Sequence, residues 1–369
     1  MNHTLPNVLM IPPTTHSGRG TIKKLSLECE AFGVRGMLVH GRSLERGGML
    51  NTVLNSFHDN FTLMPWCHGG GEPTLDQLET LLADAREFQP EWVASIGGGS
   101  VMDIGKACAG LLDAPKPAVD YHEGEALPAA RIPFLAVPTT AGTGSEATTV
   151  SVLTNKGKGV KKSIRHPSHL PRVIILDSEL LDGCPRHVVA WSGLDALTQA
   201  VESYVSKGAT WFSDVCALKA VRMINTALPA VFAGETGDAS QRLLEGSYLA
   251  GLALSHARLG FVHGLAHPLG CRYDVAHGLA CAVCLPPVLE FNRKTIAQKY
   301  DGLSTIVDGD LLQHTQSLME RLGIESPFKG QPVKDQEGIV SETLASGSTK
   351  ANPRKVTNRD VNAMLKKLF

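Results

Sequence analysis

Short apolar runs that alternate with amphipathic segments constrain the fold of the first half of this chain. Four runs have the length and composition of buried strands: MLVHG (37–41), WVASIGGGS (92–100), FLAVPTT (134–140) and VIILD (173–177). Two of them follow helical patterns, TIKKLSLECEAFG (21–33) and LDQLETLLADAREF (75–88). Strands separated by helices of this length indicate βαβ units, so we predict a parallel sheet with packed helices.

The pattern changes after about Asp182, because strand-like runs no longer occur. Long amphipathic runs rich in small residues follow, for example VVAWSGLDALTQAVESYVS and RLLEGSYLAGLALSHARLG, and we expect only helices there. A chain of 369 residues is too long for one hydrophobic core. We therefore predict an α/β domain over residues 1–178 and an all-helical domain over residues 179–369.

Composition and charge exclude several classes of partner. The formal net charge is −1 and no basic stripe stands out, which argues against nucleic acids and anionic membranes. We find no signal-peptide pattern and no apolar run of membrane-spanning length, so we expect a cytoplasmic protein. Scattered cysteines fit a reducing compartment. The one close pair, Cys281 and Cys284, lies in an apolar helical run, and we interpret it as core packing rather than a redox motif.

Two glycine-rich loops follow predicted strands. Gly97, Gly98, Gly99 and Ser100 stand where a strand ends and a helix begins, an arrangement that can cradle a pyrophosphate. The loop does not match GxGxxG, and a tight strand-to-helix turn is the alternative. The second loop, PTTAGTGSE (138–146), adds the hydroxyls of Thr139, Thr140 and Thr143. Loops at the carboxyl ends of neighbouring parallel strands would face one crevice, where open α/β sheets bind nucleotides.

Three histidines mark the helical half. His263 and His267 are four residues apart and would project from one helix face, and His277 follows a loop-like segment. A single histidine in such a setting is usually a core residue, but three together indicate a metal or proton-relay site.

With these motifs identified, the chain resembles the iron-containing (group III) alcohol dehydrogenases, which are related to the dehydroquinate synthase-like superfamily. The resemblance covers essentially the whole chain and depends on GGGSVMDIGKA, PTTAGTGSEAT, GLDALTQAVESY, GFVHGLAHPLGCRYDVAHG and the late NPR at 352–354. It implies a dinucleotide-binding α/β domain, a helical domain, and a nicotinamide cofactor in the cleft between them. It also implies one divalent metal, iron(II) or zinc, an alcohol or aldehyde substrate, and homodimers or larger assemblies.

The resemblance also assigns site residues. It places metal ligands at Asp195, position 199, His263 and His277. Bound metal acts as a Lewis acid on the substrate oxygen, so we count His263 and His277 as catalytic. His267 matches a histidine near the metal and cofactor, and it could relay the alcohol proton.

Two further positions match family residues that contact the cofactor. Lys162 corresponds to a lysine near the ribose. Asp103 corresponds to a residue close to the nicotinamide end. Either could instead be a solvated charge.

Position 199 departs from the family pattern, because it is Gln199 where the family has histidine. An amide oxygen is a weak, neutral donor compared with imidazole. The site could bind metal weakly through Asp195, His263 and His277, it could prefer another ion, or it could lack metal and depend on His267. Our hypothesis is a weakened site.

The residues after the second strand bear on the choice of cofactor. NAD-dependent members of the family tend to carry an acidic residue there, whereas this chain has Gly41, Arg42 and Ser43. A cation and a hydroxyl suit a 2′-phosphate, so we predict a preference for NADP(H) over NAD(H).

The leading function is therefore an NAD(P)-dependent oxidoreductase that interconverts an alcohol and an aldehyde or ketone. A metal-independent reductase, as in the maleylacetate reductase branch, is the alternative that Gln199 motivates. A dehydroquinate synthase-like lyase is disfavoured by Asp195 and by PTTAGTGSE. Arg272 could meet an anionic substrate group, or it could pair with Asp274 or Glu202.

Overall fold

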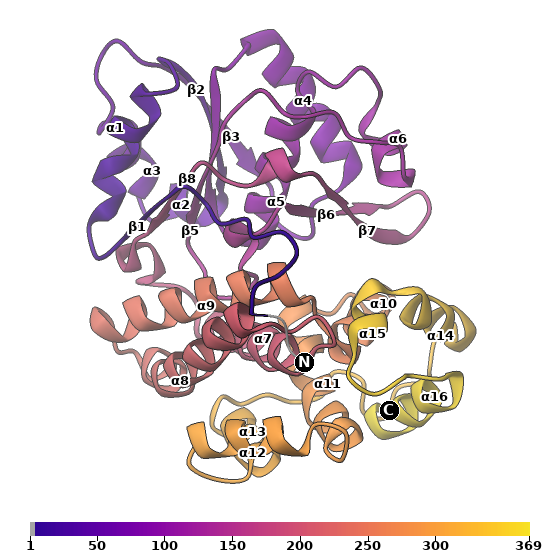
Figure 1. The fold of residues 1–369 in the computed structure, drawn as a ribbon. Helices are drawn as coiled ribbons and strands as arrows, with labels where there is room; N and C mark the ends of the chain where they lie inside the picture. The colour runs from indigo at the N-terminus through magenta and orange to yellow at the C-terminus, as the bar shows by residue number, and fades with distance from the viewer. Residues whose placement is uncertain (1–3) are drawn as a thin grey trace. The chain divides into compact units, whose positions relative to one another are not determined.

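The computed structural model describes residues 4–369, which divide into two compact units (Figure 1). The α/β unit consists of Met10–Thr140 and Ser145–Gly183. The helical unit consists of Cys184–Phe369 together with Ala141–Gly144 and the N-terminal segment that ends at Leu9. The second glycine loop is therefore shared, since its first three residues lie in one unit and the next four in the other.

The α/β unit is built on a six-stranded sheet with the order β1-β8-β5-β4-β2-β3, in which all neighbours are parallel. Its strands are β1 (Thr14–Ser17), β2 (Arg35–Gly41), β3 (Thr62–His68), β4 (Trp92–Gly97), β5 (Phe134–Pro138) and β8 (Val173–Leu176). The helices of this unit are α1 (Leu25–Glu30), α2 (Arg42–Arg46), α3 (Met49–Leu54), α4 (Leu75–Phe88), α5 (Gly99–Leu111) and α6 (Ala118–Glu123). The predicted parallel sheet is confirmed; β1 and β3 were not predicted.

The strand order reverses direction once. The chain places β3 outside β2 and then returns to the other side of β2 with β4. In open α/β sheets, ligands bind outside the carboxyl ends of the strands at such a switch point. The switch point lies between β2 and β4, so it is flanked by Gly41 at the end of β2 and Gly97 at the end of β4.

The apolar core of the α/β unit explains why these strands form. Trp92 is fully buried at the start of β4, and its ring stacks on Phe57 with centroids 5.9 Å apart. The indole Nε1 donates a hydrogen bond of 3.0 Å to the carbonyl oxygen of Gly33, so its polar atom is satisfied. Leu38, Ile96 and Leu135 from the central strands complete this apolar layer.

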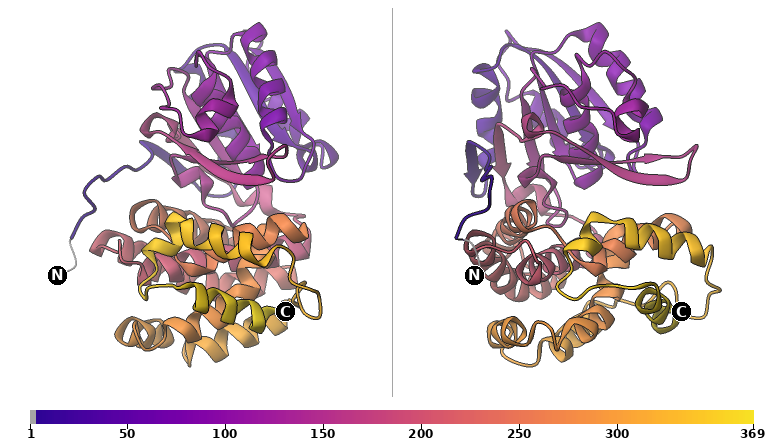
Figure 2. Two further views of the ribbon diagram at one scale, coloured as in Figure 1. Left: turned by 90° about the vertical axis from the view of Figure 1, so that its right-hand side faces the viewer. Right: turned by 45° about the vertical axis from the view of Figure 1, so that its right-hand side comes forward.

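A separate antiparallel hairpin, β6 (Val150–Asn155) and β7 (Val160–Arg165), lies outside the sheet (Figure 2). Its strands are joined by a turn over residues 156–159. This hairpin was not predicted from the sequence. Two of its lysines, Lys161 and Lys162, lie on β7 and form ion pairs with Glu72 and Glu123.

The helical unit contains the long helices α7 (Arg186–Val205), α8 (Trp211–Ala233) and α9 (Asp238–Ala257), which pack against one another. The remaining helices are α10 (Phe261–Tyr273), α11 (His277–Asn292), α12 (Ala297–Ile306), α13 (Leu311–Arg321), α14 (Gln336–Ala345), α15 (Gly347–Ala351) and α16 (Asn358–Leu368). Among the residues that the structure describes, this unit has no strand, as predicted.

The expectation that no apolar run reaches membrane-spanning length was wrong for α8. By length and composition this one helix could cross a membrane. It packs against α7 and α9, with Ala217, Val221 and Ile224 buried, as expected for the core helix of a bundle.

Candidate metal and cofactor sites

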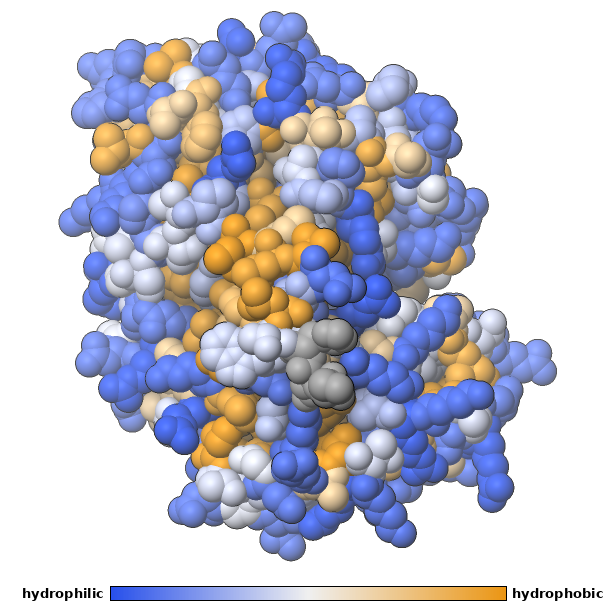
Figure 3. All heavy atoms as spheres, in the orientation of Figure 1, coloured by the Kyte–Doolittle hydropathy of each residue, from blue (hydrophilic) through white to orange (hydrophobic). Residues whose placement is uncertain are grey.

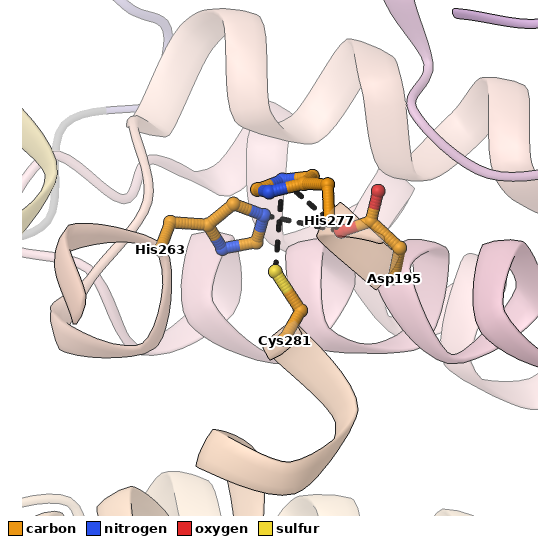
Figure 4. A group of neighbouring side chains, drawn as sticks. All are labelled: Asp195, His263, His277 and Cys281. Carbon is orange, nitrogen blue, oxygen red and sulfur yellow. Dashed lines mark hydrogen bonds and ion pairs between the residues drawn. The ribbon is translucent and has the colours of Figure 1, made fainter. Parts of the chain in front are cut away.

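Four side chains from three helices of the helical unit converge on one point (Figure 4). Asp195 comes from α7, His263 from α10, and His277 and Cys281 from α11. One donor atom from each lies within 4.8 Å of all the others. The Nε2 atom of His263 is 3.2 Å from Asp195 Oδ1, and His277 Nε2 is 3.9 Å from the same oxygen. Sulfur is also part of the group, since Cys281 Sγ lies 3.6 Å from His277 Nε2.

Several donor atoms in this region are buried without a well-formed hydrogen bond. Gln199 Oε1 has no hydrogen-bond partner, and Asp195 Oδ1 and His263 Nε2 face each other as an ion pair at 3.2 Å without forming one. Buried polar atoms without partners are costly, and folded proteins rarely retain them without a functional reason. A bound cation would satisfy these lone pairs, so the residues present fit a divalent metal.

Glu202 holds His263 from the side away from the cluster. It is buried on α7, and its Oε2 atom lies 2.7 Å from His263 Nδ1. Because a carboxylate accepts, Nδ1 carries a proton, so Nε2 is the nitrogen that would offer its lone pair to a bound cation. The other oxygen, Oε1, accepts a hydrogen bond of 2.6 Å from the backbone N–H of Val262. Glu202 therefore sets both the tautomer of His263 and the start of α10.

The charges within the cluster are strongly coupled. Burial by itself raises the pKa of Asp195, but His277 and His263 outweigh it and bring that pKa below its usual value. Burial lowers the pKa of His263, but Cys281, Asp195 and Glu202 together raise it well above its usual value. The carboxylates of Asp195 and Glu202 thus favour a positive charge between them, and a divalent cation would supply it.

The other predicted residues of this site lie close by. His267 is half-buried on α10, and its ring centroid is 4.9 Å from that of His277 and 6.4 Å from that of His263. Gln199 is one helical turn after Asp195 on α7. The structure thus groups Asp195, His263, His267 and His277 as the sequence analysis expected.

Two residues of this region were missed. Cys281 was interpreted as core packing; it is buried, but its sulfur lies in the histidine cluster. Glu202 was considered only as a partner for Arg272. Helical spacing offered a signal for both, because Cys281 follows His277 by four residues and Glu202 follows Asp195 by seven.

The predicted cofactor residues of the α/β unit gather at the switch point. β4 ends at Gly97 and α5 begins at Gly99, and no side chain caps the first turn of α5. Val101 N already donates to the carbonyl oxygen of Gly98 at 3.0 Å, so the N–H groups before it, on Gly99 and Ser100, are the ones positioned for an anion. A Cβ atom on Gly98 would lie 3.2 Å from Thr140 Oγ1, so the two glycine loops are in close contact. Thr139 N donates to the carbonyl oxygen of Gly97 at 2.9 Å, which joins them further.

On the other side of the switch point, Gly41 ends β2, and Arg42 and Ser43 open α2 with exposed side chains. Glu45 follows on α2 and lies beside His40, with 3.9 Å between Oε1 and Nε2.

Asp103 and Lys162 have protein partners. Asp103 Oδ1 accepts a hydrogen bond of 2.5 Å from Ser145 Oγ, and Oδ2 accepts one of 3.1 Å from the backbone N–H of Val152. Lys162 Nζ lies 3.6 Å from Glu123 Oε2 at the exposed surface. The remaining predicted cofactor residue, Thr143, belongs to the helical unit.

The predicted partners of Arg272 were wrong. Its Nη2 atom lies 2.6 Å from Asp335 Oδ2 and 2.6 Å from Glu342 Oε1, so it pairs with these carboxylates rather than with Asp274 or Glu202. Two carboxylates already neutralise the guanidinium, which disfavours the role of binding an anionic substrate.

Comparison with known proteins places this arrangement in a family. The sequence model described as "Iron-containing alcohol dehydrogenase" matches residues 12–178. The model described as "Fe-containing alcohol dehydrogenase family, C-terminal" matches residues 189–369. The chain therefore belongs to the iron-containing alcohol dehydrogenase family.

Individual relatives support the same family assignment. The chain is 36% identical to 1,3-propanediol dehydrogenase of Citrobacter freundii over 98% of both chains. It is 35% identical to "Probable alcohol dehydrogenase EutG" of Escherichia coli strain K12, over 85% of this chain and 82% of the relative. The solved structure of an iron-containing alcohol dehydrogenase from Thermococcus thioreducens matches with a TM-score of 0.91 and 28% identity, covering 98% of this chain and 99% of that one. The chain is thus an alcohol/aldehyde oxidoreductase of a family that uses NAD(P) and iron.

Proposed function

We propose that this enzyme is a metal-dependent alcohol dehydrogenase or aldehyde reductase that prefers NADP(H) to NAD(H). The observation that carries the metal dependence is the convergence of donor atoms from Asp195, His263 and His277, next to the buried Gln199 Oε1 that has no hydrogen-bond partner. Residues 1–178 are proposed as the dinucleotide-binding domain and residues 179–369 as the metal and substrate domain. The ion would be iron(II) or zinc, held by Asp195, His263 and His277, with Gln199 as a weak further donor.

The protein's own residues prepare the site for this reaction. When bound, the metal would polarise the substrate oxygen. The nicotinamide would donate a hydride to, or accept one from, the substrate carbon bonded to that oxygen. Glu202 fixes the tautomer of His263 through a 2.7 Å contact. His267, half-buried beside His277, is proposed to deliver the proton to the alkoxide oxygen or to take it from the alcohol.

Arg42 and Ser43 support the proposed cofactor preference, because both are exposed beside the switch point. A charge-assisted hydrogen bond is worth about 1.5–3 kcal/mol, so Arg42→Ala is expected to raise KM for NADPH roughly 10- to 100-fold. KM for NADH should change little. Arg46→Ala, an exposed arginine on the same short helix, is the matched control. A wild-type enzyme with a higher kcat/KM for NADH than for NADPH would contradict the proposal.

Metal-independent reduction is a second candidate, which Gln199 favours because an amide replaces the family's imidazole. Both candidates predict consumption of NADPH with a panel of aldehydes and keto acids. Treatment with EDTA, followed by addition of iron(II) or zinc, separates them. Activity that is lost with the chelator and restored by the ion supports the metal enzyme; activity that survives in metal-free protein supports the alternative.

We further propose a cytoplasmic homodimer. The N-terminal segment exposes the apolar side chains of Leu5, Val8, Leu9 and Ile11. Figure 3 shows hydrophobic residues gathered in patches on one face of the molecule. An exposed apolar surface of this kind is typical of a protein–protein interface. Sedimentation velocity should show a species of twice the 39.4 kDa chain mass.

A further inference from the structure

Cys281 is placed like a metal ligand rather than like a core residue. It lies four residues after His277 on α11, so both side chains project from the same face of that helix. The thiol is completely buried, yet its sulfur points to the imidazole of His277 and the carboxylate of Asp195 (Figure 4). Gln199 on α7 is only a weak fourth donor, so Cys281 on α11 is a candidate to replace it.

The distances fit a tetrahedral ion. With metal–nitrogen and metal–oxygen bonds of about 2.05 Å and a metal–sulfur bond of about 2.3 Å, tetrahedral geometry separates N and O donors by about 3.3 Å and N and S donors by about 3.6 Å. The observed separation of His263 Nε2 from Asp195 Oδ1 is 3.2 Å, and that of His277 Nε2 from Cys281 Sγ is 3.6 Å. His277 Nε2 and Asp195 Oδ1, at 3.9 Å, are slightly further apart.

We propose that Cys281 is the fourth protein ligand of the metal, in an Asp-His-His-Cys site formed with Asp195, His263 and His277. This proposal depends on the metal-dependent function proposed above. It changes the expected ion, because a soft thiolate donor favours zinc or cobalt(II) over iron(II). It also changes the expected affinity, because a site with four strong donors is not weakened by the loss of the imidazole at position 199.

The charges of the four donors also fit a divalent ion. A coordinating divalent ion deprotonates a thiol outright, and the anions of Asp195 and Cys281 would then balance its two charges. Cys284, one turn further along α11, is equally buried but is not part of the cluster.

Cobalt(II) provides a direct test. Metal-free protein is titrated with cobalt(II), and the near-ultraviolet spectrum is searched for a thiolate-to-cobalt charge-transfer band at one ion per chain. Wild type, Cys284→Ser and Gln199→Ala are expected to show the band, because each retains Cys281. Cys281→Ser is expected to bind cobalt without the band.

Zinc affinity, measured by chelator competition, gives a second readout. Loss of a partner that only orients a ligand costs 10- to 100-fold in affinity, so loss of a direct ligand in Cys281→Ser should weaken zinc binding by more than about 100-fold relative to Cys284→Ser.

The outcomes separate the two proposals. Cobalt bound stoichiometrically by wild type without a charge-transfer band would overturn the assignment of Cys281 while leaving the metal-dependent function intact. Failure of wild type to bind cobalt or zinc at all would overturn the metal-dependent function itself. If Cys281→Ser does not fold, the wild-type, Cys284→Ser and Gln199→Ala spectra still decide, since a missing band in all three refutes the assignment.

Discussion

Glu202 offers the sharpest test of how this site is held. Its carboxylate accepts hydrogen bonds from Val262 N at 2.6 Å and from His263 Nδ1 at 2.7 Å. Glu202→Gln keeps the shape but replaces one acceptor oxygen with an NH2 group. If the amide oxygen stays on Val262 N, the new donor faces His263 Nδ1. The imidazole must then move its proton to Nε2, and the lone pair that faces the cluster is lost.

The expected loss of zinc affinity follows from the hydrogen bond that Glu202→Gln removes. A hydrogen bond to a charged group contributes about 1.5–3 kcal/mol, and substitution of a residue that orients a metal ligand typically costs 10- to 100-fold in affinity. The second range corresponds to about 1.4–2.7 kcal/mol, so the two estimates agree. We therefore expect Glu202→Gln to weaken zinc binding by 10- to 100-fold.

The assay is zinc competition against a chromophoric chelator, with far-ultraviolet circular dichroism to establish that each variant is folded. Glu290→Gln is the control for loss of a negative charge, because Glu290 lies on α11 at the surface and pairs with Lys367. Equal zinc affinities for Glu202→Gln and Glu290→Gln would refute the argument that Glu202 fixes the tautomer of His263.

Three further perturbations test other parts of the molecule. Lys106→Met should destabilise the α/β unit to urea by about 3–5 kcal/mol, because it leaves half-buried Asp103 and four acceptor atoms without their cation; a loss below about 1 kcal/mol would contradict this. Burial raises the pKa of Glu146 from 4.5 to about 7, so the folded state binds more protons in this window and loses stability as pH rises through it. Glu146→Gln should therefore flatten the dependence of Tm on pH between those values, removing up to about 3 kcal/mol, and an unchanged slope would count against it. Gly144→Ala should cost about 1–3 kcal/mol more than Gly183→Ala, because both have positive φ but only the first Cβ would meet backbone, at 2.5 Å from Gly251; equal losses would show that this contact is unimportant.

Much of the α/β unit could be predicted because its signals are local. Runs such as FLAVP are apolar on both faces, and Thr74 with Gln77 forms the capping box that starts α4 at the predicted residue. The strands that were missed lack such signals. β1 has only four residues and joins the sheet through β8, some 160 positions later. β7 buries only Ile164 and carries two lysines.

The expectation that no apolar run is long enough to span a membrane failed for a related reason. Considered alone, α8 is long and apolar enough to cross a membrane. Packing against α7 and α9 explains its composition, and no local window of sequence contains that information.

The candidate site shows the same division between near and distant residues. Helical periodicity alone places His263 with His267, Asp195 with Gln199, and His277 with Cys281, because residues four apart share a helix face whatever surrounds it.

Only the packing of α7, α10 and α11 decides which of these faces meet. That packing brings Cys281 into the cluster and sets Glu202 behind His263, although 61 positions separate the latter pair. The packing of α10 against α14 gives Arg272 its partners, Asp335 and Glu342. The spacing of residues along a helix is a property of the backbone, whereas contacts between helices depend on how side chains across the whole chain fill space, and the sequence of any one segment cannot specify them.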